Sequence, residues 1–205
     1  MIKVLIVEDH KSMRDALRQM LEQSKEFEVV GEIPGANYAL LYCERKKPDV
    51  VLMDICTEGN VSGLDATRMI RKELPDIKVV IMTAFDEVSF LPRARDAGAH
   101  AFIYKRRSLE YFSEVIRGVM EGKTFFPEAA SITFPTGETP LTRREMDVLR
   151  CICKHMTNKE IAEELFISEN TVKYHKSNML AKTGFSNSVD LAFHMILNGW
   201  INPLL

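Results

Sequence analysis

The sequence has no long hydrophobic run and almost no net charge. No apolar stretch reaches the roughly 18 residues that a membrane-spanning helix needs, so no membrane partner is predicted. Lysine and arginine total 27 against 29 for aspartate and glutamate, which leaves a net charge of −2. Composition alone therefore indicates no nucleic-acid partner. With only 10 glycines and 8 prolines, collagen-like and low-complexity chains are excluded.

Cysteines are few and unpaired in pattern. Cys43, Cys56, Cys151 and Cys153 form neither a CxxC pair nor a disulfide framework. The amino terminus reaches the acidic pair Glu8-Asp9 too early for a secretory signal. We therefore expect a cytoplasmic protein with reduced thiols.

Residues 1–105 contain five short, β-branched apolar runs, and segments with helical periodicity separate them. The runs cover residues 4–7, 29–30, 50–53, 79–82 and 101–103. The helical segments cover residues 13–21, 36–44, 64–74, 88–97 and 109–120. Strands that alternate with helices predict an α/β fold, a doubly wound five-stranded parallel sheet with helices on both faces.

The pattern changes near residue 122. A segment with Pro127, Pro135 and Gly137, followed by Pro140, predicts a linker over residues 123–139, although its phenylalanines indicate that part of it packs. Residues 140–205 predict a small all-α domain of four helices. Capping boxes at Thr142 and Thr157 begin the first two helices; Ser168 caps a third that runs from residue 169 to about 183. The fourth runs from about 188 to 198.

Polar side chains follow four of the predicted strands. Glu8 and Asp9 come after the first strand, Asp54 after the third, Thr83 after the fourth and Lys105 after the fifth. The carboxyl ends of parallel strands share one edge of a sheet, so these groups should converge there. Clustered carboxylates attract a hard cation such as Mg²⁺, and an aspartate among them can accept a phosphoryl group.

Residues 1–122 resemble a response-regulator receiver domain of flavodoxin-like topology. The matching words are VLIVEDH at 4–10, VLMD at 51–54, GLDA at 63–66, VIMTA at 80–84 and AGAHAFIYK at 97–105. The resemblance implies that Asp54 is the phosphoacceptor and that Thr83 and Lys105 contact the phosphoryl group. It also implies a Mg²⁺ held by Glu8, Asp9, Asp54 and the backbone carbonyl of Cys56. Thr83 and Phe102 would be the switch residues.

The loop after the phosphoacceptor departs from the receiver pattern. Thr57-Glu58 replaces the usual Met-Pro, and Gly63 stands nine residues after Asp54 instead of eight. Ser62 replaces an aspartate, and Arg106 follows Lys105 where many receivers have proline. These differences leave open how the loop alters phosphorylation.

The third predicted helix of the second domain carries the positive charge of that domain. No acidic residue occurs from Asn170 to Val189. Asn170, Lys173, Tyr174 and Ser177 share one helical face, which suits base contacts in a DNA major groove. We expect phosphate contacts from Lys159, Lys176 and Lys182, and a further DNA contact from Thr171. His175 either contacts a phosphate or packs within the domain as a hydrogen-bonded helix residue.

Residues 140–205 resemble a LuxR-type helix-turn-helix domain. The matching words include TNKEIA at 157–162, TVK at 171–173 and KTG at 182–184. His155 and Ser188 replace the glycine and arginine usual in that family. In it the last helix often forms dimers, which here would use Leu191, Ala192, Met195 and Ile196; packing within the domain is the alternative.

Over nine-tenths of the chain therefore resembles a NarL/FixJ-family response regulator of a two-component system. This implies a transcription factor that binds double-stranded DNA, a sensor histidine kinase as partner, and a homodimer when active. No dedicated enzyme activity is expected. Two alternatives remain: a DNA-binding regulator that works without phosphorylation, and a phosphohydrolase that uses Asp54 as nucleophile.

Overall fold

The computed structural model describes residues 1–59, 61–85, 87, 89–128, 134 and 141–201. The chain divides into two compact units. The first contains Met1–Ala84 and Phe90–Glu128; the second contains Phe85–Ser89 and Ala129–Leu205. Most of the predicted linker, the predicted helix start at Val88 and the last four residues lie outside the described residues.

The first unit is built on a five-stranded parallel sheet in the order β2-β1-β3-β4-β5. The strands are β1 (Ile2–Val7), β2 (Phe27–Ile33), β3 (Val50–Asp54), β4 (Lys78–Thr83) and β5 (Ala101–Tyr104). Residues 4–7 of β1 and 50–53 of β3 are fully buried on both faces, as expected of a parallel sheet covered by helices. The predicted fold class is confirmed, with each strand within two or three residues of its predicted bounds.

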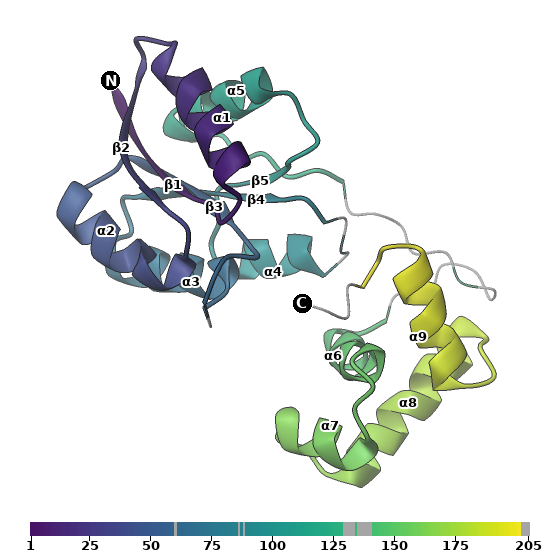
Figure 1. The fold of residues 1–205 in the computed structure, drawn as a ribbon. Helices are drawn as coiled ribbons and strands as arrows, with labels where there is room; N and C mark the ends of the chain where they lie inside the picture. Colours follow the sequence, from purple (N-terminus) through teal and green to yellow (C-terminus); the bar gives the residue numbers. More distant parts are fainter. Residues whose placement is uncertain (60, 86, 88, 129–133, 135–140, 202–205) are drawn as a thin grey trace. The chain divides into compact units, whose positions relative to one another are not determined.

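Helices cover both faces of this sheet (Figure 1). One face carries α1 (Lys11–Glu22) and α5 (Leu109–Met120), which share a core with Ile6, Leu52 and Ile103. The other face carries α2 (Ala39–Lys46), preceded by the 3-10 turn η1 (Ala36–Tyr38), with α3 (Gly63–Glu73) and α4 (Phe90–Asp96). Strand order reverses between β1 and β3, so the carboxyl edge there is the expected ligand crevice.

The chain beyond α5 returns to the sheet and lines the free edge of β5. Gly122 has φ of 84°, a left-handed conformation that glycine tolerates, and turns the chain back. Phe125 then pairs with Ala101 in parallel. The amide of Phe102 donates to the Phe125 carbonyl at 2.7 Å, and the Phe125 amide donates to the His100 carbonyl at 3.3 Å.

Four helices make up the described core of the second unit: α6 (Arg143–Cys153), α7 (Asn158–Glu164), α8 (Glu169–Thr183) and α9 (Ser188–Leu197). Thr142 and Thr157 form the predicted capping boxes, and the Ser168 hydroxyl caps α8. Gly184 ends α8 in a left-handed conformation. The buried residues Val148, Ile161, Val172 and Leu191 join the four helices in one core.

Candidate functional site

The carboxyl edge of the sheet brings together side chains from four strand ends. Glu8 follows β1 and is fully buried; Asp54 is the last residue of β3 and is 2% exposed. Thr83 ends β4 and is buried, and its carbonyl accepts from the Lys105 amide at 2.7 Å. The convergence that the strand ends predict is therefore present, because the parallel register aligns these ends.

Lys105 is the electrostatic centre of this site. Its Nζ lies 2.7 Å from a carboxylate oxygen of Asp54 and 2.7 Å from one of Glu8. Burial raises the pKa of the Asp54 carboxyl to about 6, although the Lys105 ammonium acts to lower the pKa. Burial also acts to lower the pKa of Lys105, but its contacts with the two carboxylates raise that pKa above the ordinary value. Near neutral pH the site therefore holds an ionised, poorly hydrated Asp54.

Asp9 is held at the rim of the same site. Its Oδ1 lies 2.7 Å from Nδ1 of His10, whose imidazole is also 3.4 Å from Glu8. Arg14, in the first turns of α1, donates to the carbonyls of Glu8 at 2.6 Å and Asp9 at 3.0 Å. Neither His10 nor Arg14 is among the predicted site residues. The signal for His10 is its place directly after the acidic pair.

The donor set fits a hard divalent cation. Three carboxylates, those of Glu8, Asp9 and Asp54, lie at this edge of the sheet, and the Lys105 ammonium contacts two of them. Carboxylate oxygens are the ligands that Mg²⁺ prefers. Glu8, Asp9 and His10 also place ligand atoms within 4.8 Å of one another. Cys56 lies two residues beyond Asp54, on the same loop, and its carbonyl remains a predicted ligand.

Gly63 locks the loop after Asp54 despite its extra residue. The Gly63 amide donates to the Ile55 carbonyl at 2.9 Å, and a Cβ at Gly63 would overlap the Asp54 carbonyl. Ser62 caps α3 by accepting from the Asp65 amide at 3.2 Å. The added residue is thus accommodated before Ser62, and the glycine keeps its contact with the strand that carries Asp54.

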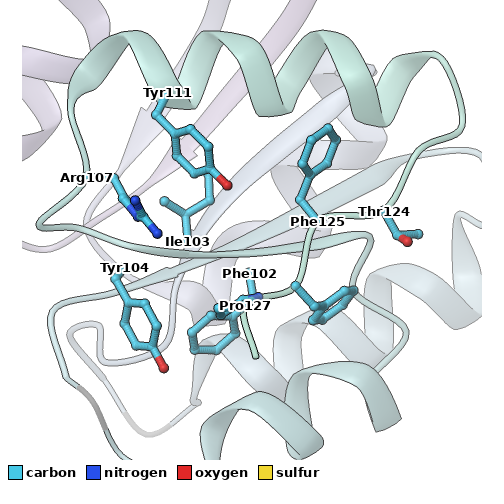
Figure 2. A pocket seen from close by; sticks show the side chains of 9 residues that line it. Phe102, Ile103, Tyr104, Arg107, Tyr111, Thr124, Phe125 and Pro127 are labelled. Carbon is cyan, nitrogen blue, oxygen red and sulfur yellow. The ribbon is translucent and has the colours of Figure 1, made fainter. Parts of the chain in front are cut away.

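Phe102 and Tyr104 stand on the same face of β5. Their rings meet edge to face with centroids 5.3 Å apart, and Phe102 is only 2% exposed. A cavity of about 220 Å³ lies beside them, lined also by Arg107, Tyr111 and residues 124–127 (Figure 2). The predicted switch aromatic therefore lies between the candidate phosphoacceptor site and the edge of the sheet.

The face of α8 that was predicted to contact DNA bases is exposed. Asn170, Lys173, Tyr174 and Ser177 are all exposed, whereas Val172 and Met179 on the opposite side are fully buried. Lys159 is exposed on α7. The Thr171 amide bonds to the capping hydroxyl of Ser168 at 3.1 Å, so Thr171 is tied to the start of α8.

Two of the predicted phosphate contacts have partners inside the second unit. Lys182 Nζ lies 2.8 Å from Oε2 of Glu145, a buried carboxylate that also closes the α6 capping box. Lys176 Nζ donates to Asn158 Oδ1 at 3.1 Å. His175 is half-buried and its ring meets that of Tyr174 with centroids 5.7 Å apart. Sequence spacing could not reveal these partners, which come from α6 and α7.

The four residues predicted for dimer formation on the last helix face inward. Leu191 and Met195 are fully buried, Ala192 is 6% exposed, and Ile196 is half-buried against the same core. The alternative, packing within the domain, holds for this set. Exposed apolar side chains lie elsewhere on α9, at Val189, Phe193 and Leu197, with exposed fractions of 69%, 61% and 68%.

One departure from the LuxR pattern affects the backbone at His155. His155 has φ of 61°, so a non-glycine residue takes the left-handed position where the LuxR pattern has glycine.

All four cysteines are free. Burial raises the pKa of Cys43 to about 12 and that of Cys153 to about 11, which makes both thiols unreactive. Among the described residues, no helix combines the length and apolarity that a membrane span requires.

Comparison with known families matches both halves of the chain. Residues 4–117 match the response regulator receiver domain, and residues 139–195 match the luxR family of bacterial regulatory proteins. The chain belongs to the response regulators and carries a LuxR-type DNA-binding domain after its receiver.

The chain is also similar to individual response regulators along most of its length. The response regulator protein VraR of Staphylococcus aureus is 36% identical over 188 residues, which cover 88% of this chain and 90% of VraR. The transcriptional regulatory protein LiaR of Bacillus subtilis is 32% identical over 212 residues, which cover 98% of this chain and all of LiaR. A solved structure of two RcsB dimers on two parallel DNAs shares the fold, with a TM-score of 0.66, 22% identity and coverage of 97% and 98%.

Proposed function

We propose that the chain is a transcription factor that phosphorylation of Asp54 switches on. The observation that carries this proposal is the contact of Lys105 with both Asp54 and Glu8, at 2.7 Å each, in a buried acidic site. A receiver joined to a LuxR-type domain supports the regulatory output. A sensor histidine kinase would supply the phosphoryl group, and the protein would act in the cytoplasm.

Each group of the site has a role in phosphoryl transfer. The Asp54 carboxylate attacks phosphorus, and the bond from phosphorus to the donor breaks. The Lys105 ammonium pairs with a phosphoryl oxygen as a point charge, and the Thr83 hydroxyl donates to another. Glu8 and Asp9 would hold Mg²⁺, which neutralises phosphoryl charge when it is bound. The catalysis consists of positioning and charge neutralisation.

The signal then passes to β5. A phosphoryl group at Asp54 adds negative charge and acceptor oxygens beside Thr83. Movement of the Thr83 side chain toward it would let the Phe102 ring on the neighbouring strand β5 rotate. No hydrolytic turnover of external substrates is proposed, since Asp54 is followed by Ile55 and Cys56 with no second carboxylate beside the nucleophile.

The DNA-binding face is the exposed face of α8. Lys173 and Asn170 stand near its amino-terminal half, where a recognition helix meets base edges. Lys159 on α7 is free to approach phosphates. Lys182 contacts the buried Glu145, so its main contribution is to the stability of the domain and its contribution to DNA binding is smaller.

We also propose that the active form is a homodimer joined through α9. Val189, Phe193 and Leu197 follow i, i+4, i+8 spacing and form one apolar stripe that the domain core leaves uncovered. A two-fold axis would place two such stripes against each other and two α8 helices on successive half-sites.

The test is a DNase footprint on DNA selected from random sequences, with and without acetyl phosphate and Mg²⁺, at stated salt. Tighter binding with acetyl phosphate, lost in Asp54→Ala, is expected. Equal binding in both states, unchanged by Asp54→Ala, would support the phosphorylation-independent alternative. Multiple turnovers of a phosphate ester would support the phosphohydrolase.

A further inference from the structure

Residues 124–127, called the strap below, run beside the outer edge of β5, where Phe125 forms an isolated parallel bridge with Ala101. The Phe102 amide donates to the Phe125 carbonyl, and the Phe125 amide donates to the His100 carbonyl. The strap thus satisfies backbone groups along the otherwise free edge of β5. It is also the stretch through which the chain leaves the first unit toward the DNA-binding half.

Successive side chains of the strap pack on opposite faces of the sheet, as side chains do along an extended chain. Phe125 packs with the core under α1 and α5, whereas Phe126 packs with the core under α2, α3 and α4. Figure 2 shows Phe125 on the same side as Tyr111, with Phe102 and Tyr104 on the other. The guanidinium of Arg95, on α4, lies 4.3 Å from the centre of the Phe126 ring.

The ring of Phe125 occupies a site made for it on α5. Gly118 is buried in the last turn of this helix, and glycine lowers helix stability by up to about 1 kcal/mol relative to alanine. A Cβ at Gly118 would overlap the far edge of the Phe125 ring. The missing side chain therefore makes room for the strap at the expense of local helix propensity.

The strap and the Phe102 ring share contacts. Phe102 bonds to the strap through its amide, and its side chain lines the same 220 Å³ cavity as Phe126 and Pro127. The strap is therefore joined to the backbone of Phe102 and borders the space beside its ring, so a change at one can affect the other.

We propose that the strap is the output element of the receiver: rotation of Phe102 weakens its pairing with β5 and so changes where the chain leaves the sheet. This inference rests on the proposed function, which supplies the rotation. Coupling between two events is reciprocal, so weakening the strap must favour occupation of the phosphoryl site by the same factor.

The experiment uses the full chain with Mg²⁺ and beryllofluoride as the phosphoryl probe. The variants are Gly118→Ala, which displaces the Phe125 ring, and Phe125→Ala/Phe126→Ala, which removes both rings. Glu114→Ala, at an exposed position of α5, is the matched control. Hydrogen exchange of the Phe102 and Phe125 amides reports strap pairing, and calorimetry reports beryllofluoride affinity.

We expect beryllofluoride to speed exchange of both amides in the parent chain. Both strap variants should show fast exchange without it and bind it about fivefold more tightly, while Glu114→Ala matches the parent. If the parent binds beryllofluoride but the two amides stay equally protected and the variants bind no more tightly, the strap proposal is wrong and the proposed function stands. If the parent does not bind beryllofluoride at all, the phosphorylation switch fails and the strap's role fails with it.

Discussion

Lys105 and Asp54 meet at 2.7 Å at the carboxyl edge of the receiver sheet, and both side chains are shielded from water. The same ammonium is equally close to Glu8. A single cation therefore holds two buried carboxylates from two strands in reach of each other. The same contacts therefore serve both stability and phosphoryl transfer, because removing the Lys105 ammonium leaves two buried carboxylates without a cation.

Replacing Lys105 by methionine should affect chemistry and stability together. We expect labelling by acetyl phosphate to fall at least tenfold, since a phosphoryl oxygen loses its cation, and the free energy of unfolding to fall by about 1–3 kcal/mol. Urea unfolding and single-turnover labelling measure the two effects. Lys123→Met is the control, because Lys123 is paired with Glu121 on the surface, where an ion pair contributes little. Normal labelling in Lys105→Met would contradict the assigned role.

Gly63→Ala should distort the phosphoacceptor strand through packing alone. A methyl group there collides with the Asp54 carbonyl, so we expect a loss of roughly 2 kcal/mol or more in stability and weaker beryllofluoride binding. Ser62→Ala removes only the cap of α3 and should cost about 1 kcal/mol with beryllofluoride affinity retained. Equal affinities in the two variants would show that the close approach of Gly63 has no bearing on the site.

Two lysines of α8 should separate DNA binding from folding. Lys173→Ala removes an exposed cation, so DNA affinity should weaken by about 1–3 kcal/mol while stability stays within about 0.5 kcal/mol. Lys182→Ala leaves the buried Glu145 without its cation and should cost about 1–2 kcal/mol of stability. Fluorescence anisotropy and thermal unfolding of both variants test the division, which the reverse pattern would refute.

The stripe on α9 should matter only for binding of two copies. Phe193→Lys places a charge in the proposed dimer contact, so affinity for a probe with two half-sites should fall roughly tenfold, while a single half-site is bound as before. Leu41→Lys, at a 42% exposed position of α2, is the control. Analytical ultracentrifugation on DNA counts the bound copies; unchanged two-copy binding would rule out this surface.

His100 should make the receiver sensitive to acid. Burial, with the charges of Arg71 and Lys78, lowers its pKa from 6.5 to about 4, and its Nδ1 accepts from the Val79 amide at 3.2 Å. The unfolded chain therefore binds a proton at a higher pH than the folded chain. Stability present above pH 6.5 should decline as pH falls toward 4, by about 1–3 kcal/mol at pH 4.5. His100→Gln should flatten this decline in urea titrations; an unchanged slope would exclude His100 as its source.

The sequence alone sufficed for the elements and for the chemistry of the sheet edge. Continuous apolar runs identify buried parallel strands, and topology sends Glu8, Asp54, Thr83 and Lys105 to one edge whatever the details of packing. The capping boxes at Thr142 and Thr157 are likewise local signals, which hydrogen bonds within one helical turn satisfy. Such features depend on neighbours in sequence or on strand direction.

Only the tertiary structure decided which partner each side chain meets across the fold. Leu191 and Met195 turn inward and Phe193 outward because α9 docks on α6 and α8 through one of two apolar faces that its sequence offers. Lys182 pairs with Glu145, which lies 37 positions earlier in the sequence. The Phe125 ring packs against Gly118 because the chain reverses direction at Gly122. These contacts arise from packing between distant segments, so residue spacing along one helix or strand cannot predict them.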